Sequence, residues 1–216
     1  MLRRRLVVAL AVAAAAFALV PAQAGASPEE TSAAAVTGLN AYWSGVFSEL
    51  GRTYSPPAGI VWYGDEGVST RCGVTRPHNA MYCTTDRTIY LDRWLYSHFA
   101  VELGLPFAVT VVIAHEWGHA IQDEFGLFRP VRRRNLLWTE QQADCYAGLY
   151  TRYEDQVGAL GDGDVGAGIA LMVAAGDPEG IPGPFSHGTS DVRVRNFLRG
   201  YATGDLRACE SVLFGH

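Results

Sequence analysis

The chain has 216 residues, of which 49% are hydrophobic and 18% are charged. This composition is typical of a globular protein and excludes a disordered one, and the length suits a single domain. The formal net charge is −5. It becomes more negative if a basic leader is removed, so we expect the surface to repel phosphate backbones and to bind no nucleic acid.

Residues 1–24 have the layout of a secretory signal peptide. Three arginines, Arg3 to Arg5, precede an unbroken apolar run over 6–20, and small residues then form a cleavage site that ends at Ala24 or Ala26. The run is short for a membrane span, so we expect cleavage and no lasting membrane anchor; an uncleaved anchor is the alternative. The sequence therefore predicts an exported protein with a flexible start over 25–35 and one domain over 36–216.

Four cysteines, an even number in an exported chain, indicate two disulfides. They are Cys72, Cys83, Cys145 and Cys209. The sequence allows three pairings. We favour Cys72 with Cys83, because these two flank one short polar loop, and this choice leaves Cys145 with Cys209. Zinc ligation by cysteine is the competing role, but the chain contains no C-x-x-C pair.

Hydrophobic spacing predicts two helices and three short strands in the first half of the domain. In chain order these are a helix over 36–50, strands over 59–63, 80–83 and 88–91, and a helix over 93–103. Only four residues separate the last two strands, so they form a predicted hairpin. Gly51 and Gly104 end the two helices.

The second half is predicted to be helical. In chain order the helices cover residues 106–125, 138–155, 167–175 and 191–201. The first begins at Pro106, where a missing N–H costs nothing, and it is apolar almost all round, so it is a central, buried helix. Ser190 is the expected N-cap of the last helix. Together these patterns predict an α+β fold, mainly helical with a small sheet.

The central helix carries the motif His115-Glu116-Trp117-Gly118-His119. Histidines four residues apart lie on one face of a helix and can bind one metal ion. In an H-E-x-x-H motif the glutamate, here Glu116, is the general base beside a zinc-activated water. Chance can produce the pattern, but such polar groups on an apolar helix are costly without a partner, and a metal supplies one.

A zinc hydrolase needs a third protein ligand. A third histidine six residues after His119 is excluded, because Phe125 stands there. Glu140 and Asp144 instead offer two acids one turn apart on the following helix. We expect Glu140 to bind the metal and Asp144 to accept a hydrogen bond from a ligand histidine. The alternatives are that Asp144 is the ligand, or that both acids are simply solvated.

The segments Ala114–His119 and Glu140–Gly148 resemble the neutral zinc metallopeptidase family, and their E-x-x-x-D element is similar to that of gluzincins. Two further segments match the family, one from Cys72 to Asp92 and one from Ser186 to Tyr201. The resemblance implies a zincin-like fold, Zn²⁺ as the cofactor and a peptide or protein substrate. The chain departs from the family at 120–121, where a further histidine is more usual, but this departure leaves the histidine pair intact.

His187 lies in a loop rich in Gly and Pro before the last helix, and a polar side chain on such a loop can reach a cleft. It is a candidate hydrogen-bond donor to the oxyanion formed in peptide hydrolysis; the alternative is a structural role. Tyr146 is a weaker candidate for the same role. The predicted hairpin offers a sheet edge along which an extended peptide can bind.

The sequence therefore predicts a secreted zinc peptidase in which zinc is held by His115, His119 and Glu140. The alternative is a zinc-binding structural or interaction module of the same fold, which would need no Glu116. Substrate, cleavage preference and oligomeric state are not indicated by the residues.

Overall fold

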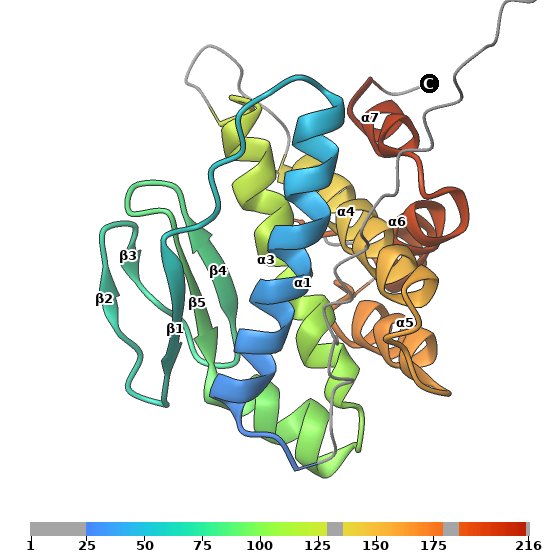
Figure 1. The fold of residues 1–216 in the computed structure, drawn as a ribbon. Helices are drawn as coiled ribbons and strands as arrows, with labels where there is room; N and C mark the ends of the chain where they lie inside the picture. Colours follow the sequence, from blue (N-terminus) through green and yellow to red (C-terminus); the bar gives the residue numbers. More distant parts are fainter. Residues whose placement is uncertain (1–24, 129–135, 179–185, 215–216) are drawn as a thin grey trace, which may run out of the picture.

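The computed structural model describes residues 25–128, 136–178 and 186–214, so the predicted signal peptide lies outside the described residues. The described residues form the expected α+β fold, mainly helical with a small sheet (Figure 1). In chain order the elements are α1 (Pro28–Glu49), β1 (Gly59–Tyr63), β2 (Ser69–Thr70), β3 (Gly73–Val74), β4 (Ala80–Cys83), β5 (Thr88–Asp92), α2 (Arg93–Leu95), the π-helix η1 (Tyr96–Glu102), α3 (Pro106–Glu124), α4 (Leu136–Gln156), α5 (Asp164–Ala174), α6 (Ser190–Thr203) and α7 (Leu206–Phe214).

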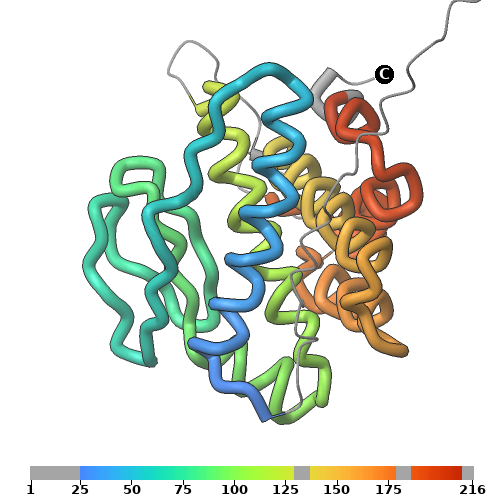
Figure 2. The backbone as a smooth tube through the Cα atoms, viewed as in Figure 1, coloured from blue at the N-terminus to red at the C-terminus, as the bar shows by residue number. Residues whose placement is uncertain are grey.

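Helix α3 lies at the centre of the molecule. The small sheet lies on one side of it, helices α4 and α5 pack on the other, and α1 crosses it, as the chain trace also shows (Figures 1 and 2). Nearly all side chains of α3 from Phe107 to Gln122 are buried. The prediction of a central, buried helix is therefore confirmed.

The main sheet has the strand order β1-β5-β4. Strand β5 pairs with β1 in parallel and with β4 antiparallel, so the predicted hairpin of β4 and β5 is confirmed. The hairpin is tied to α3 by two side-chain contacts, from the Tyr82 hydroxyl to Asp123 Oδ2 at 3.1 Å and from Arg87 to Glu124 Oε1 at 2.7 Å. These contacts hold the edge strand β4 beside the helix that carries the histidine motif.

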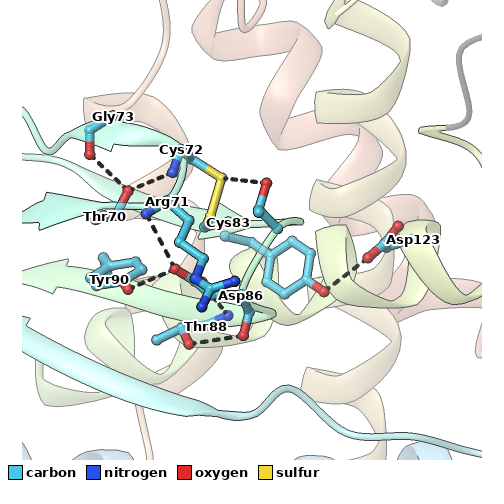
Figure 3. The surroundings of a disulfide bond; sticks show 11 residues. Thr70, Arg71, Cys72, Gly73, Cys83, Asp86, Thr88, Tyr90 and Asp123 are labelled. Carbon is cyan, nitrogen blue, oxygen red and sulfur yellow. Dashed lines mark hydrogen bonds between the residues drawn. A yellow bond between two sulfur atoms is a disulfide. The ribbon is translucent and has the colours of Figure 1, made fainter.

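Both predicted disulfides are present, so no cysteine is left to bind a metal. The two short strands β2 and β3 were not predicted from the sequence. Cys72 lies in the turn between them, and its bond to Cys83 ties this turn to the end of β4 (Figure 3). Cys145 and Cys209 are buried and join α4 to α7. Helix α7 was not predicted either.

The N-terminal segment requires a correction. Helix α1 begins at Pro28, so the prediction of a flexible start over 25–35 is wrong from that residue on. The cause is a reciprocal cap, in which Glu30 N donates to Ser27 Oγ at 3.2 Å and Ser27 N donates to Glu30 Oε2 at 2.7 Å. This capping box and the following alanines favour a helix that apolar spacing alone does not reveal.

Two further helix ends differ from the prediction. The helix expected over 93–103 becomes a π-helix from Tyr96 on. The N-cap of α6 is Thr189 and not Ser190, because the Ser190 hydroxyl donates to the carbonyl of Val173 at 2.8 Å and so is used to join α6 to α5.

Helices α4 and α6 approach each other at two glycines. A methyl group built on Gly148 would lie 2.0 Å from the carbonyl oxygen of Phe197, and one built on Gly200 would lie 2.0 Å from that of Cys145. Both contacts involve backbone atoms, which cannot turn aside. Only glycine therefore allows these two helices to pack at this distance.

We expect Gly148→Ala to destabilise the protein by roughly 3 kcal/mol or more, because α6 would have to move away from α4. Gly45→Ala is the matched control, since Gly45 is an exposed residue of α1 with nothing near its added methyl group. That control should stabilise the fold by about 0.5–1 kcal/mol through helix propensity. Urea unfolding of both variants measures the difference, and equal stabilities would contradict the packing argument.

Candidate active site

The structure brings together His115 and His119 from α3 and Glu140 from α4, whose ligand atoms lie within 4.8 Å of one another. His115 Nε2 is 3.1 Å from Glu140 Oε2, and His119 Nε2 is 3.4 Å from Glu140 Oε1. All three side chains are largely buried. The two helices approach closely at Gly118, where a methyl group would lie 3.1 Å from the Cα of Ala143.

Asp144 lies one turn further along α4 and faces the other nitrogen of His115. The distance from His115 Nδ1 to Asp144 Oδ1 is 2.8 Å. Among the acids considered from the sequence, Glu140 therefore faces the Nε2 atoms and Asp144 faces an Nδ1 atom. Neither acid is solvated, since Glu140 is 5% exposed and Asp144 is fully buried.

Arg193 of α6 binds Asp144 with two hydrogen bonds, from Nε to Oδ2 at 3.0 Å and from Nη2 to Oδ1 at 2.7 Å. Its third nitrogen donates to the carbonyl of Ala175 at 3.0 Å. The guanidinium therefore balances a buried carboxylate and links α4, α5 and α6. Sequence reasoning assigned Arg193 no role, because nothing in local spacing relates it to an acid 49 residues earlier.

Burial and neighbouring charges act in opposite directions on the pKa values of this site. Burial lowers the pKa of His115, but the hydrogen bonds and charges of Asp144 and Glu140 outweigh burial and raise that pKa to about 10. Burial raises the pKa of Glu140, but the charge of His119 and the hydrogen bonds from both histidines hold it well below its usual value. Because the raised pKa keeps His115 protonated, a metal ion that binds to it must displace a proton.

A cavity of about 630 Å³ opens over these residues. Its floor is partly apolar, with side chains from α3, α5 and η1. The polar side chains that line it include His115, Glu116, His119, Glu140, His187 and Arg193. Glu116 is 6% exposed, so the predicted general base lies at the inner wall of the cavity, next to the histidine pair.

His187 lines the same cavity, with its side chain half exposed. The end of its loop is held by Asp177, whose Oδ2 accepts hydrogen bonds from the backbone N–H groups of His187 at 2.6 Å and Gly188 at 3.2 Å, and from the Ser186 hydroxyl at 3.0 Å. His187 Nδ1 lies 3.8 Å from Asp177 Oδ1. Asp177 thus places the imidazole at the cavity, a role that the sequence did not reveal.

Tyr146, the weaker candidate for this role, is buried, and its hydroxyl donates to Glu210 Oε1 at 2.9 Å. The acids and tyrosine of the hairpin also have structural contacts. Asp86 accepts hydrogen bonds from Thr88 N at 3.1 Å and from the Tyr90 hydroxyl at 3.0 Å (Figure 3), and Asp92 caps α2.

Two histidines on a buried helix, a glutamate on the next helix and a small sheet beside them define a zincin-like protein with a site that could bind a metal ion. The chain belongs to the family described as putative neutral zinc metallopeptidase, since a model of that family matches residues 12–212.

Among the proteins similar to this chain are two that are named as uncharacterized. The uncharacterized protein YpfJ of Escherichia coli strain K12 is 32% identical over 214 residues, which cover 86% of this chain and 73% of the relative. The uncharacterized protein Rv2575 of Mycobacterium tuberculosis strain H37Rv is 30% identical over 172 residues, which cover 67% of this chain and 59% of the relative. No solved structure shows a significant match to the chain.

Proposed function

We propose that this protein is an exported zinc peptidase that hydrolyses peptide bonds. The observation that carries the proposal is the convergence of two imidazole Nε2 atoms and one carboxylate beneath a cavity, with Glu116 on the same helix lining that cavity. Family membership supports the same chemistry.

The donor set fits zinc. Two imidazole nitrogens and one carboxylate are ligands that catalytic zinc sites use, and three protein ligands leave a fourth position open. Both histidines also use Nδ1 for hydrogen bonds, His115 to Asp144 at 2.8 Å and His119 to Gln122 at 2.8 Å. Their Nε2 atoms are thus directed to the metal position, as the outer partners of ligand histidines usually ensure.

Zinc, when bound, supplies a Lewis acid that polarises the scissile carbonyl and makes water more acidic. Glu116 accepts a proton from the attacking water and passes it to the leaving amine. His187 donates a hydrogen bond to the oxygen that becomes negative in the tetrahedral state. Asp144 and Arg193 hold His115 in place.

The substrate is an extended peptide or protein segment. Strand β4 is at the edge of the main sheet, and Ala80, Met81 and Tyr82 line the cavity. An extended chain can add to such an edge through backbone hydrogen bonds, which recognise a peptide whatever its sequence. The acidic balance of the chain argues against nucleic acid as a partner.

Two disulfides support export, because such bonds persist in oxidising compartments. Among the described residues, no helix combines the length and apolar character that crossing a membrane requires. We propose that the leader is removed and that the mature protein keeps no membrane anchor.

Metal content and cleavage, measured together, test the proposed function. We expect the oxidised protein to bind one zinc per chain and to cleave a denatured protein substrate, with products identified by mass spectrometry. Removing zinc with a chelator should abolish cleavage, and adding zinc should restore it. Zinc binding without cleavage of any substrate would instead support the non-catalytic module of the same fold.

A further inference from the structure

The two histidines of the site use different partners for Nδ1. His115 faces the carboxylate of Asp144, which can only accept a hydrogen bond. His119 faces the neutral amide of Gln122, whose Oε1 is 2.8 Å from His119 Nδ1. An amide has a donor end and an acceptor end. Some other group must therefore decide which end Gln122 turns toward the histidine.

A run of buried hydrogen bonds leads away from Gln122. Its Nε2 donates to the carbonyl of Thr139 at 2.6 Å and to Gln142 Oε1 at 3.1 Å. Gln142 Nε2 in turn donates to Glu210 Oε1 at 3.3 Å. Gln122 and Gln142 are fully buried, so their amides depend on these partners. The run connects α3 through α4 to α7.

The far end of this run sets its direction. A carboxylate carries no hydrogen, so Gln142 must turn its amino group to Glu210 and its oxygen to Gln122. Gln122 then meets two acceptors, Gln142 Oε1 and the Thr139 carbonyl, and must turn its amino group to both. Its oxygen is left facing His119, which therefore carries hydrogen on Nδ1, so that in the neutral imidazole the lone pair lies on Nε2.

Helix α7 is anchored where the run ends. Cys209, the neighbour of Glu210, forms a disulfide with Cys145, the neighbour of Asp144. The hydroxyl of Tyr146 also donates to Glu210 Oε1 at 2.9 Å. The carboxylate at the end of the run is therefore held against the same helix that carries Glu140.

We infer that Gln122, Gln142 and Glu210 form a positioning relay, which holds His119 with its Nε2 lone pair directed to the metal. None of the three touches a reacting atom, so they are positioning residues. The inference rests on the zinc site proposed above and extends it to a helix that the histidine motif does not include.

Gln122→Met tests the first link, because methionine keeps the length of the side chain and removes both ends of the amide. We expect the zinc dissociation constant, measured by competition with a coloured chelator, to rise roughly 10–100-fold, as when other outer partners of metal ligands are removed. In ¹⁵N-histidine NMR of the zinc-loaded protein, the Nδ1–H signal of His119 should broaden through exchange with water.

Thr151→Val is the matched control, since Thr151 is a buried polar residue of α4 that donates to the carbonyl of Ala147 at 2.9 Å and has no place in the relay. This control can lower stability, but it should leave the zinc dissociation constant and the His119 signal unchanged. An equal loss of zinc affinity in the control would overturn the relay, because the loss would then follow stability alone.

Glu210→Met tests the far end without altering α3. The single variant Glu210→Met should raise the zinc dissociation constant. The double variant with Gln122→Met should show no further rise, because Glu210 acts on His119 only through Gln122. Additive losses would overturn the role of Glu210, and an unchanged dissociation constant and NMR signal in Gln122→Met would overturn the relay as a whole. Failure of the wild-type protein to bind zinc would instead overturn the proposed function, so the two failures are distinguishable.

Discussion

Replacing Glu116 with glutamine is expected to leave zinc bound and to lower kcat by roughly 10²–10⁴-fold, the usual contribution of a general base. Glutamine has nearly the same shape as glutamate but cannot accept a proton from water. Glu116 lines the cavity beside His115 and His119 but is not among the three grouped ligand residues. Zinc content and peptide hydrolysis, measured on the same sample, separate metal binding from proton transfer.

Glu124→Gln is the control for this experiment. Glu124 lies on the same helix, at its last residue, and pairs with Arg87 at 2.7 Å. Glutamine keeps a side-chain oxygen that can accept the hydrogen bond from Arg87, so the control should keep both zinc and turnover. If Glu116→Gln retained full activity, Glu116 would not be the general base; if it lost zinc, Glu116 would belong to the metal ligands.

Glu140→Ala is expected to remove zinc from the protein, whereas Asp144→Asn should retain zinc with an affinity roughly 10–100-fold lower. The difference follows from which nitrogen each acid faces. Glu140 lies against the Nε2 atoms of both histidines, and Asp144 lies against Nδ1 of His115 alone. Zinc stoichiometry and the dissociation constant of each variant measure the two roles.

Stability must be followed in the same experiment, because Asp144→Asn leaves Arg193 buried without its carboxylate partner. Breaking one side of a buried ion pair typically costs about 3–5 kcal/mol. Urea unfolding shows whether the variant is folded under the conditions of the zinc measurement. Loss of zinc from a folded Asp144→Asn protein, together with its retention in Glu140→Ala, would reverse the two assignments.

Patterns of local spacing were sufficient for much of this molecule. The helix that bears His115 and His119 was evident from its apolar residues, and the acids one turn apart on the next helix identified Glu140 and Asp144. The hairpin was evident because its two strands are separated by a short turn. Each of these signals lies within a few residues of the chain, where helix and strand periodicity directly relates sequence to position.

The supporting residues could not be predicted in this way. Arg193 reaches Asp144 only because α6 packs on α4 at Gly148 and Gly200. The amide of Gln142 reaches Glu210 from 68 residues away. The start of α1 at Pro28 was not predicted for a different reason. It is marked in the sequence by a pair of polar capping residues and not by apolar residues at helical spacing. Contacts between residues far apart in the chain depend on how the helices pack, and helix or strand periodicity in the sequence does not predict that packing.

The nine residues from Glu140 to Gly148 contain both a residue of the proposed zinc site and a residue required for helix packing. Substitutions at these two positions have different consequences. Glu140 belongs to the proposed zinc site, whereas Gly148 sets the distance between α4 and α6. A descendant that lost Glu140 could keep the fold and lose the proposed zinc site. A descendant that lost Gly148 would have to move α6, and with it Arg193, so the proposed zinc site would be disturbed even if His115, His119 and Glu140 were all kept. We therefore expect divergence in this lineage to spare the glycine longer than the acid.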